Sequence, residues 1–291
     1  MGGIYWLASY PKSGNTWFRS VLANFRATGD APVDINQLNT GAIASSRNWV
    51  DDVLGVDTAD LTQDEVEAIR PEIYRWSVAE APNELGYHKI HDAYTHRADG
   101  RPLVDDVASL GAVYLLRNPL DVAPSLANHN GVDIDAAIAQ MRDQTHALAR
   151  AKNRLTGQLL QRMGSWSQHV ESWVDAREIP VFVLRYEDMH ADPIAAFGAA
   201  FSALGLPENP QRLKQAIAFS QFDTLAAQEE AHGFRERPSG KRRFFRKGKV
   251  GDWQNSLTPA QVAQVIADHG PIMQRFGYID GAGQPLASPA P

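Results

Sequence analysis

The first 25 residues constrain the fold more than any other part of the chain. An apolar run over residues 4–8 is typical of a buried strand, and residues 16–25 carry apolar side chains at helical spacing. The segment between them, residues 9–15, reads S-Y-P-K-S-G-N. A strand that passes through a glycine-bearing turn into a helix directs backbone N–H groups and the positive end of the helix dipole towards one point. The sequence therefore predicts a binding site for a phosphate-like anion at this turn.

The side chains of the turn support this prediction. Lys12 supplies a positive charge, and Ser13 and Thr16 supply hydroxyl donors. The turn is not the usual nucleotide-triphosphate loop, G-x-x-x-x-G-K-[ST], because Lys12 precedes Gly14 instead of following it. Two Gly-Lys pairs near the C-terminus are followed by arginine and by valine, so neither completes that pattern. The alternative is an ordinary strand-to-helix turn with a solvated lysine.

Composition excludes several classes of function. The 291 residues are 44% hydrophobic and 21% charged, which is ordinary for a globular protein. The chain has no cysteine, and this excludes disulfides, thiol nucleophiles and thiolate metal sites. The net charge of −6 does not favour nucleic-acid binding. No apolar run approaches the roughly 20 residues of a membrane span, and the N-terminus lacks a signal-peptide pattern. We expect a cytoplasmic protein without a membrane or nucleic-acid partner.

Three apolar segments indicate the fold class. Residues 4–9, 112–117 and 180–186 are strand candidates, and helical stretches separate them along the chain. This alternation predicts an α/β fold with a central parallel sheet that helices cover on both faces. In such sheets ligands bind beyond the carboxyl ends of the strands. The candidate functional residues follow strand candidates, as this rule requires.

We expect a single domain over residues 1–280. Residues 61–68 within it are predicted to be helical, with Thr62 opening a capping box. Residues 226–248 are highly charged with few apolar side chains, so we expect a mobile loop there. Residues 281–291 are rich in glycine, proline, alanine and serine and are predicted to be a disordered tail.

Two later segments carry a resemblance to a known family. Residues 117–125 read R-N-P-L-D-V-A-P-S, and residues 246–255 read R-K-G-K-V-G-D-W-Q-N. Together with the first turn they resemble Y-P-K-S-G-T-T-W, R-N-P-x-D-V-x-x-S and R-K-G-x-x-G-D-W-K-N. These three motifs mark the sulfotransferases that use 3′-phosphoadenosine-5′-phosphosulfate (PAPS), particularly the cytosolic type and its bacterial relatives. The motifs occur here in the family's order, with Asn15 and Gln254 as the clear deviations. The resemblance spans residues 4–255.

The resemblance implies a three-layer, P-loop-like fold and a specific reaction. It implies that the enzyme moves a sulfuryl group from PAPS to a hydroxyl of a small molecule or natural product, with an amine as the second choice. Transfer would be in line and would leave adenosine 3′,5′-bisphosphate (PAP) as the product. Some bacterial relatives sulfate glycopeptide antibiotics, and the compact size of this chain is compatible with that subclass.

The resemblance also implies which residues are catalytic. Lys89 and His91 alternate along an extended segment, so they face the same way. His91 matches the family's general base, and the usual imidazole pKa of roughly 6.5 suits proton transfer near neutrality. Lys12 would stabilise the charge that develops on the leaving oxygen, and Lys89 would neutralise the sulfuryl oxygens. Ser125 belongs to the same catalytic set. Two lysines supply this charge, so we expect no metal requirement.

The 3′-phosphate of the cofactor requires its own binding residues. Arg117 and Ser125 are the first candidates, because they follow a strand candidate in the middle motif. Arg246, Lys247 and the backbone of Gly248 would hold the phosphate from the other side, with arginine offering a bidentate fork. The alternative for these basic residues is a solvated, charged surface.

Adenine recognition rests on the resemblance alone. Trp17 would stack on the ring, and Tyr186, Ser220 and Phe222 match further adenine contacts of the family. Core packing is the alternative for Phe222. The residues expected to bind PAPS and PAP are Lys12, Ser13, Gly14, Asn15, Thr16, Trp17, Arg117, Ser125, Tyr186, Ser220, Phe222, Arg246, Lys247 and Gly248.

Two departures from the family limit what it implies. Residues 92–94 read D-A-Y where the vertebrate enzymes have a leucine-proline stretch, so the acceptor pocket, expected within residues 26–100, cannot be inherited from them. The family's short C-terminal dimer motif is broken at Gln254, at residues 258–259 and at Ala263. An oligomer is compatible with the sequence, but it would use a different surface.

Three other functions are alternatives. A magnesium-dependent kinase on a related fold requires the standard loop and an acid at a strand end. Residues 187–188 could be that acid, but the strand candidate at 112–116 ends in Arg117 and the loop does not fit the pattern. A non-catalytic nucleotide-binding protein would have no need of Lys12, Lys89 and His91. Nucleic-acid binding by the basic run at residues 235–249 is a more distant alternative. Three histidines near residue 91 do not have the spacing of a standard metal site.

Overall fold

A computed structural model describes residues 2–97, 99–150, 156–237 and 243–286. The chain divides into two compact units. The first unit consists of the described residues up to Tyr10 and those of Gly41–Tyr114 and Asp143–Val183. The second unit consists of the described residues of Pro11–Thr40 and Leu115–Arg142 and those from Leu184 on. The single domain over residues 1–280 stays a prediction.

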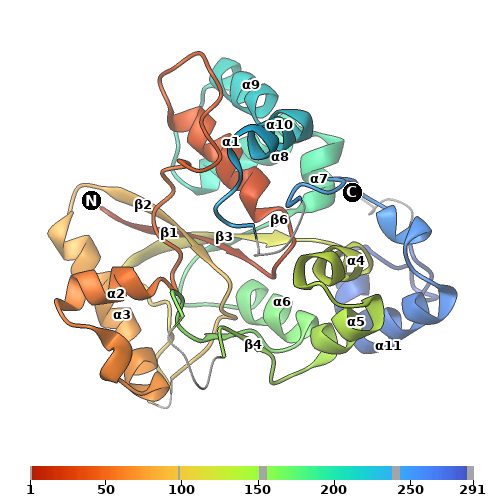
Figure 1. Cartoon of the computed structure of the whole chain (residues 1–291), viewed down its shortest axis with the longest axis horizontal. Helices are drawn as coiled ribbons and strands as arrows, with labels where there is room; N and C mark the ends of the chain where they lie inside the picture. Colours follow the sequence, from red (N-terminus) through yellow and green to blue (C-terminus); the bar gives the residue numbers. More distant parts are fainter. Residues whose placement is uncertain (1, 98, 151–155, 238–242, 287–291) are drawn as a thin grey trace. The chain divides into compact units, whose positions relative to one another are not determined.

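A four-stranded sheet is the main β-structure of the protein. Its strands are β1 (Gly3–Ser9), β2 (Leu85–Ile90), β3 (Ser109–Leu116) and β6 (Val181–Arg185), of which the last two residues of β3 and of β6 are counted with the second unit. The order is β2-β1-β3-β6, and β1 runs parallel to β2 with Ala8 opposite Ile90 (Figure 1). Consecutive residues of β1 are buried, as parallel strands covered on both faces require. The predicted α/β fold with a central parallel sheet flanked by helices is confirmed.

The other elements of the first unit are helices and one small two-stranded ribbon. They are α2 (Arg47–Leu54), the 3₁₀ helix η1 (Thr58–Asp60), α3 (Gln63–Glu80), β4 (Ala147–Leu148), β5 (Gln161–Arg162) and α6 (Trp166–Val174). Thr62 caps α3 in a complete capping box, as the sequence predicted. Helices α2 and α3 lie side by side (Figure 1), with Val50 and Ile73 buried in one cluster.

The second unit is built from helices. They are α1 (Asn15–Arg26), α4 (Pro119–Asn130), α5 (Ile134–Arg142), α7 (Tyr186–Ala191), α8 (Pro193–Ala203), α9 (Pro210–Phe219), α10 (Phe222–His232), the 3₁₀ helix η2 (Asp252–Asn255) and α11 (Pro259–Arg275). Helix α9 packs on α1, and its Arg212 donates to the carbonyl oxygens of Asn24, Phe25 and Ala27. These bonds satisfy carbonyl groups that the end of α1 leaves without a helical partner. Helices α4, α5 and α11 form a second group (Figure 1).

Residues 226–248, predicted to be a mobile loop, begin as regular structure. Residues 226–232 are the second part of α10, where Leu225 and Glu229 are buried at helical spacing. One of the two buried positions is an acid, so the helical spacing does not appear as an apolar pattern in the sequence. Phe234 is also buried, and Phe244 and Phe245 pack against its cluster. Residues 238–242 lie outside the described residues.

The predicted tail is also partly regular. Residues 281–286 turn back on the chain, and the Leu286 N–H donates to the Tyr278 carbonyl oxygen at 3.0 Å. Residues 287–291 lie outside the described residues. Of the helices described, none combines the length and the apolar character needed to cross a membrane.

Helix α6 buries one face completely. Trp166, Val170 and Trp173 are fully buried, and so is His169 on the same face. Burial lowers the pKa of His169 from its ordinary 6.5 to about 4. The folded protein therefore keeps this imidazole neutral over a pH range in which the unfolded chain protonates it.

The pH dependence of stability should reveal this histidine. Between the two pKa values the unfolded chain binds a proton that the folded protein does not bind, so stability should fall as the pH drops from about 7 to about 4. The contribution of His169 should reach about 3 kcal/mol. Urea unfolding across this range should show a shallower pH dependence for His169→Gln than for the wild type. Parallel profiles for the two proteins would contradict the assignment.

Candidate active site

The turn between β1 and α1 is the first part of the site. Lys12 and Gly14 both adopt left-handed backbone conformations, with φ angles of 72° and 94°. A Cβ atom at Gly14 would lie 2.6 Å from the Tyr186 ring, so this position requires glycine. No side chain caps the N-terminus of α1. The Ser13 hydroxyl is buried and has no hydrogen-bond partner among the described residues. A buried donor beside an uncapped helix N-terminus is suited to an anionic ligand.

Arg117 links this turn to the C-terminal motif. It directly follows β3 and is buried. Its Nη1 donates to the Lys12 carbonyl oxygen and its Nη2 to the Lys249 carbonyl oxygen, each at 3.0 Å. Its guanidinium carbon lies 4.2 Å from the centre of the Tyr186 ring. The sequence predicted that Arg117 holds a phosphate, and the structure shows that it also holds the two segments that carry the other candidate residues.

Asp121 is a site residue that sequence reasoning missed. It lies in the first turn of α4, and its carboxylate accepts the N–H groups of Gly251 at 2.7 Å and Trp253 at 2.9 Å. Burial raises the pKa of Asp121, whereas the charge of Arg117 and the two N–H donors oppose that rise. Asp121 therefore joins the middle motif to the C-terminal motif. The signals in the sequence were its place as the acid of the middle motif and the otherwise apolar start of the helix around it.

Aromatic side chains surround the expected adenine residues. The Trp17 ring lies 5.9 Å from that of Tyr186, 4.7 Å from that of His190 and 5.4 Å from that of Phe197, between ring centres. The structure thus brings together Trp17 and Tyr186, two of the residues predicted to contact adenine. His190 was not predicted, because nothing in its local sequence distinguishes it.

The structure also brings together Phe222 and Gly248, which were predicted to contact adenine and the 3′-phosphate, respectively. Gly248 has a φ of 59°, and a Cβ atom on it would lie 2.4 Å from the Phe222 ring. The ring therefore packs directly on the backbone of the C-terminal motif. Ser220 is placed differently, because its hydroxyl accepts from Asn24 at 3.1 Å and is fully buried.

The cationic side chains have protein partners. The Lys12 ammonium lies 4.2 Å from the centre of the Phe244 ring. Arg246 and Lys247 pair with the two carboxylate oxygens of Asp252, at 3.1 and 2.6 Å. Burial alone would raise the pKa of Asp252, but the bond from Lys247 and the nearby charges hold it below its usual value. A phosphate bound by Arg246 and Lys247 would compete with this carboxylate.

Glu229 holds the segment that carries these cations. Its buried carboxylate accepts the backbone N–H groups of Phe244 at 2.5 Å and Phe245 at 2.9 Å. The residues that follow are Arg246 and Lys247. Nothing in the sequence indicates this role, because Glu229 lies in a charged segment.

His91 and Lys89 belong to the first unit. Lys89 is in β2, and His91 directly follows that strand. The His91 Nδ1 atom lies 2.7 Å from the Ser9 carbonyl oxygen. A carbonyl oxygen can only accept, so Nδ1 carries the proton and Nε2 carries the ring lone pair. This is the tautomer that a base acting through Nε2 needs. Ser9 comes three residues before Lys12 in the chain.

All the residues predicted to bind the cofactor lie in the second unit. Of those not yet placed, Asn15 and Thr16 are the first two residues of α1 and are buried, and Ser125 is half-buried on α4. Within the described part of the chain, no three histidine, aspartate or glutamate side chains are arranged to hold a metal ion.

Comparisons with known proteins agree with this geometry. A family model described as a sulfotransferase domain matches residues 4–277. Sulfotransferase 2A2 of Mus musculus is 25% identical over 263 residues, covering 88% of this chain and 79% of that protein. Cytosolic sulfotransferase 16 of Arabidopsis thaliana is 24% identical over 277 residues, covering 89% and 72%. The crystal structure of mouse sulfotransferase SULT7A1 complexed with PAP is similar in fold, with a TM-score of 0.59 at 19% identity, over 97% of this chain and 86% of that one.

The hydrogen bonds by which Asp121 joins the middle motif to the C-terminal motif should contribute to the free energy of unfolding. Asp121→Ala would leave the N–H groups of Gly251 and Trp253 without their acceptor, which should cost about 2–4 kcal/mol in the free energy of unfolding. Asp223→Ala is the control, because Asp223 is an exposed acid in the first turn of α10 and its loss should cost only about 0.5 kcal/mol. Urea unfolding of both variants would test this, and equal losses would contradict the link.

Proposed function

The chain belongs to the sulfotransferase family, and we propose that it moves a sulfuryl group from PAPS to a hydroxyl of a small molecule or natural product. The family predicted from the three motifs is confirmed by the domain match over residues 4–277. The observation that carries the proposal is the position of Arg117, which bonds to the backbone of the first motif at Lys12 and of the third at Lys249.

The donor site proposed here is the turn before α1 together with the C-terminal motif. Ser13 offers a buried hydroxyl without a described partner, and the start of α1 has no side-chain cap, so both suit the 5′ end of the donor. Arg246 and Lys247 would hold the 3′-phosphate in exchange for Asp252. The mouse sulfotransferase compared above was solved in complex with PAP, which supports this choice of donor.

His91 is the proposed general base. PAPS, when bound, supplies the sulfuryl group, whose sulfur forms a bond to the acceptor oxygen as its bond to the phosphate oxygen breaks. The Nε2 atom of His91 takes the proton of the acceptor hydroxyl, since Nδ1 is committed to the Ser9 carbonyl oxygen. Lys12 stabilises the negative charge left on the phosphate oxygen, and Lys89 neutralises the sulfuryl oxygens. We favour a hydroxyl over an amine, because a neutral amine can attack before it loses a proton.

Recognition of the 3′-phosphate should depend on Arg246. Arg246→Ala would remove a charge-assisted contact, which should weaken PAP binding about 10- to 100-fold while leaving adenosine 5′-monophosphate binding within twofold. Arg243→Ala is the matched control, because Arg243 is exposed on the same segment and pairs with Glu230. Calorimetry with both nucleotides, and with ATP, would measure these affinities. Equal weakening for both nucleotides would show that Arg246 does not bind the 3′-phosphate. Tighter binding of ATP than of PAP would contradict PAPS as the donor.

Turnover should depend on His91 and donor affinity should not. His91→Ala should lower the rate of sulfuryl transfer about 10²–10⁴-fold, the usual contribution of a general base, with PAP affinity within twofold of wild type. His232→Ala, at the exposed end of α10, is the control. The assay is PAP release from PAPS with a panel of phenols, alcohols and amines. Wild-type turnover in His91→Ala would show that another group is the base.

A further inference from the structure

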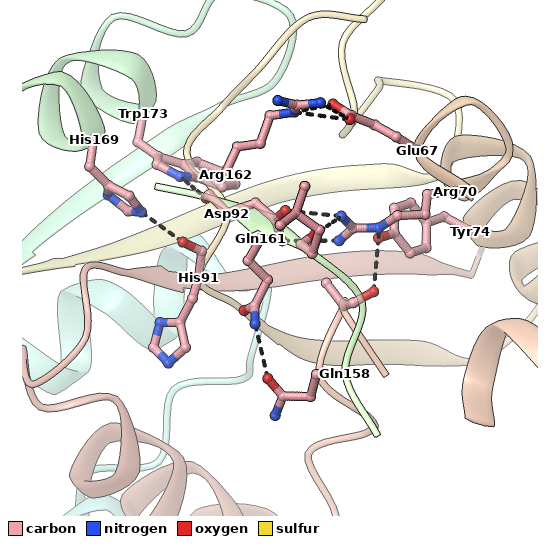
Figure 2. Close-up of polar contacts among 12 residues, drawn as sticks. Glu67, Arg70, Tyr74, His91, Asp92, Gln158, Gln161, Arg162, His169 and Trp173 are labelled. Atoms are coloured by element: carbon pink, nitrogen blue, oxygen red, sulfur yellow. Dashed lines mark hydrogen bonds and ion pairs between the residues drawn. The ribbon is translucent and has the colours of Figure 1, made fainter. Parts of the chain in front are cut away.

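Helix α6 holds the backbone immediately after β2. The His169 Nε2 atom lies 3.0 Å from the His91 carbonyl oxygen, and the Trp173 Nε1–H donates to the Asp92 carbonyl oxygen at 2.9 Å. His169 and Trp173 are four residues apart, so they lie on one face of α6. In Figure 2 the His91 ring points away from His169, whose bond is to the backbone. Two successive peptide groups are thus fixed by one helix.

The two hydrogen bonds of the His169 ring each have a defined donor and acceptor. The His91 carbonyl oxygen can only accept, so the Nε2 atom of His169 carries the proton. The neutral ring then presents a lone pair at Nδ1, and the Tyr114 hydroxyl, 2.8 Å away, donates to it. Burial lowers the pKa of His169 to about 4, which keeps the ring neutral near pH 7. Tyr114, His169 and the His91 carbonyl therefore form a directed chain of bonds that ends on the residue proposed as the base.

Asp92 is held from the opposite direction. Its carboxylate accepts hydrogen bonds from both Nη atoms of Arg70, at 2.9 and 3.0 Å (Figure 2). Both side chains are only 2% exposed. Arg70 Nε donates to the Tyr74 hydroxyl at 3.1 Å, which in turn donates to the Ala44 carbonyl oxygen at 3.0 Å. A buried ion pair rarely stabilises a fold more than apolar residues of the same volume would. The bidentate geometry is the more specific contribution of this pair.

The next two residues are held as well. The Ala93 N–H donates to the Arg162 carbonyl oxygen at 2.8 Å, and the Tyr94 N–H donates to the Ser172 hydroxyl at 2.9 Å. Residues 91–94 therefore each have a hydrogen bond to α6, α3 or β5. The backbone that follows β2 is therefore restrained at four successive residues.

We propose that His169 and the Asp92–Arg70 pair are positioning residues, which fix the backbone of residues 91 and 92 and through it the orientation of the His91 ring. The inference rests on the proposed function, because it matters for catalysis only if His91 is the base. The ring is then held at two points, by its own carbonyl group through His169 and by its Nδ1 atom through Ser9. A shift of about 1 Å in a reacting group can cost a factor of about 10² in rate, so such fixation has a measurable consequence.

His169→Met tests the first support, because methionine fills the space without donating a hydrogen bond. With PAPS as donor and 4-nitrophenol as acceptor, we expect kcat to fall 10- to 100-fold while PAP affinity stays within twofold. Nitrogen NMR of histidine-labelled protein should show His91 as the Nδ1–H tautomer in the wild type and as a mixture of tautomers in the variant. His169→Gln should restore kcat to within about threefold, since its amide N–H can replace the Nε2 donor.

The second support is tested by removing the whole ion pair. The double variant Arg70→Met and Asp92→Leu avoids an unpaired buried charge and should remain folded even if His169→Met does not. We expect the same fall in kcat and the same mixture of His91 tautomers. Ser77→Ala is the control, because it removes a hydrogen bond to Trp49 elsewhere in the first unit without touching residues 91–94. It should leave kcat and the tautomer unchanged.

The spectrum decides the proposal independently of turnover. A pure Nδ1–H tautomer of His91 in the folded variants overturns it, whatever their activity. A mixture of tautomers together with a lower kcat supports it. If the wild-type protein transfers sulfuryl groups to no acceptor, the proposed function fails, and the spectrum still shows whether these residues set the His91 ring.

Discussion

The second unit is organised around the buried guanidinium of Arg117. Guanidinium presents five N–H groups in one plane and keeps its proton at any working pH, so it can bond two carbonyl oxygens and still stack on a ring. Here those partners are Lys12, Lys249 and the Tyr186 ring. Lysine at this position has one ammonium and no planar face, so it cannot make all three contacts. Because Arg117 directly follows β3, these contacts form where parallel sheets place their ligand sites.

In each unit a buried carboxylate restrains the backbone of a segment that carries candidate site residues. Asp121 in the second unit and Asp92 in the first are both nearly fully buried, and each is bonded to groups that restrain a neighbouring segment. Burial of a carboxylate costs free energy, which the raised pKa of Asp121 records. That cost is compatible with function, because the restrained segments carry the cations and the imidazole on which the proposed transfer depends. The left-handed conformation of Lys12 is a further local cost in the same region.

The predictions that succeeded depend on short-range patterns. The strand, turn and helix at the N-terminus and the capping box at Thr62 each follow from residues within about one helical turn of one another. The residues that were missed act over long separations, as Asp121 does with residues 251 and 253. Residues 226–232 were misread because charge density was weighed above the four-residue spacing of the two buried positions in α10. A single sequence gives the type of such residues but not the partner that the fold brings to them.

The departures from the family fall unequally on the two units. The three motifs lie in or lead into the second unit, where the proposed donor is bound, and they match the family with two clear deviations. Residues 92–94, where the vertebrate leucine-proline stretch is absent, lie in the first unit next to His91. An acid buried at position 92 would be costly there without Arg70, so the two residues depend on each other. The backbone next to the proposed base is therefore held here by residues that lie outside the donor motifs.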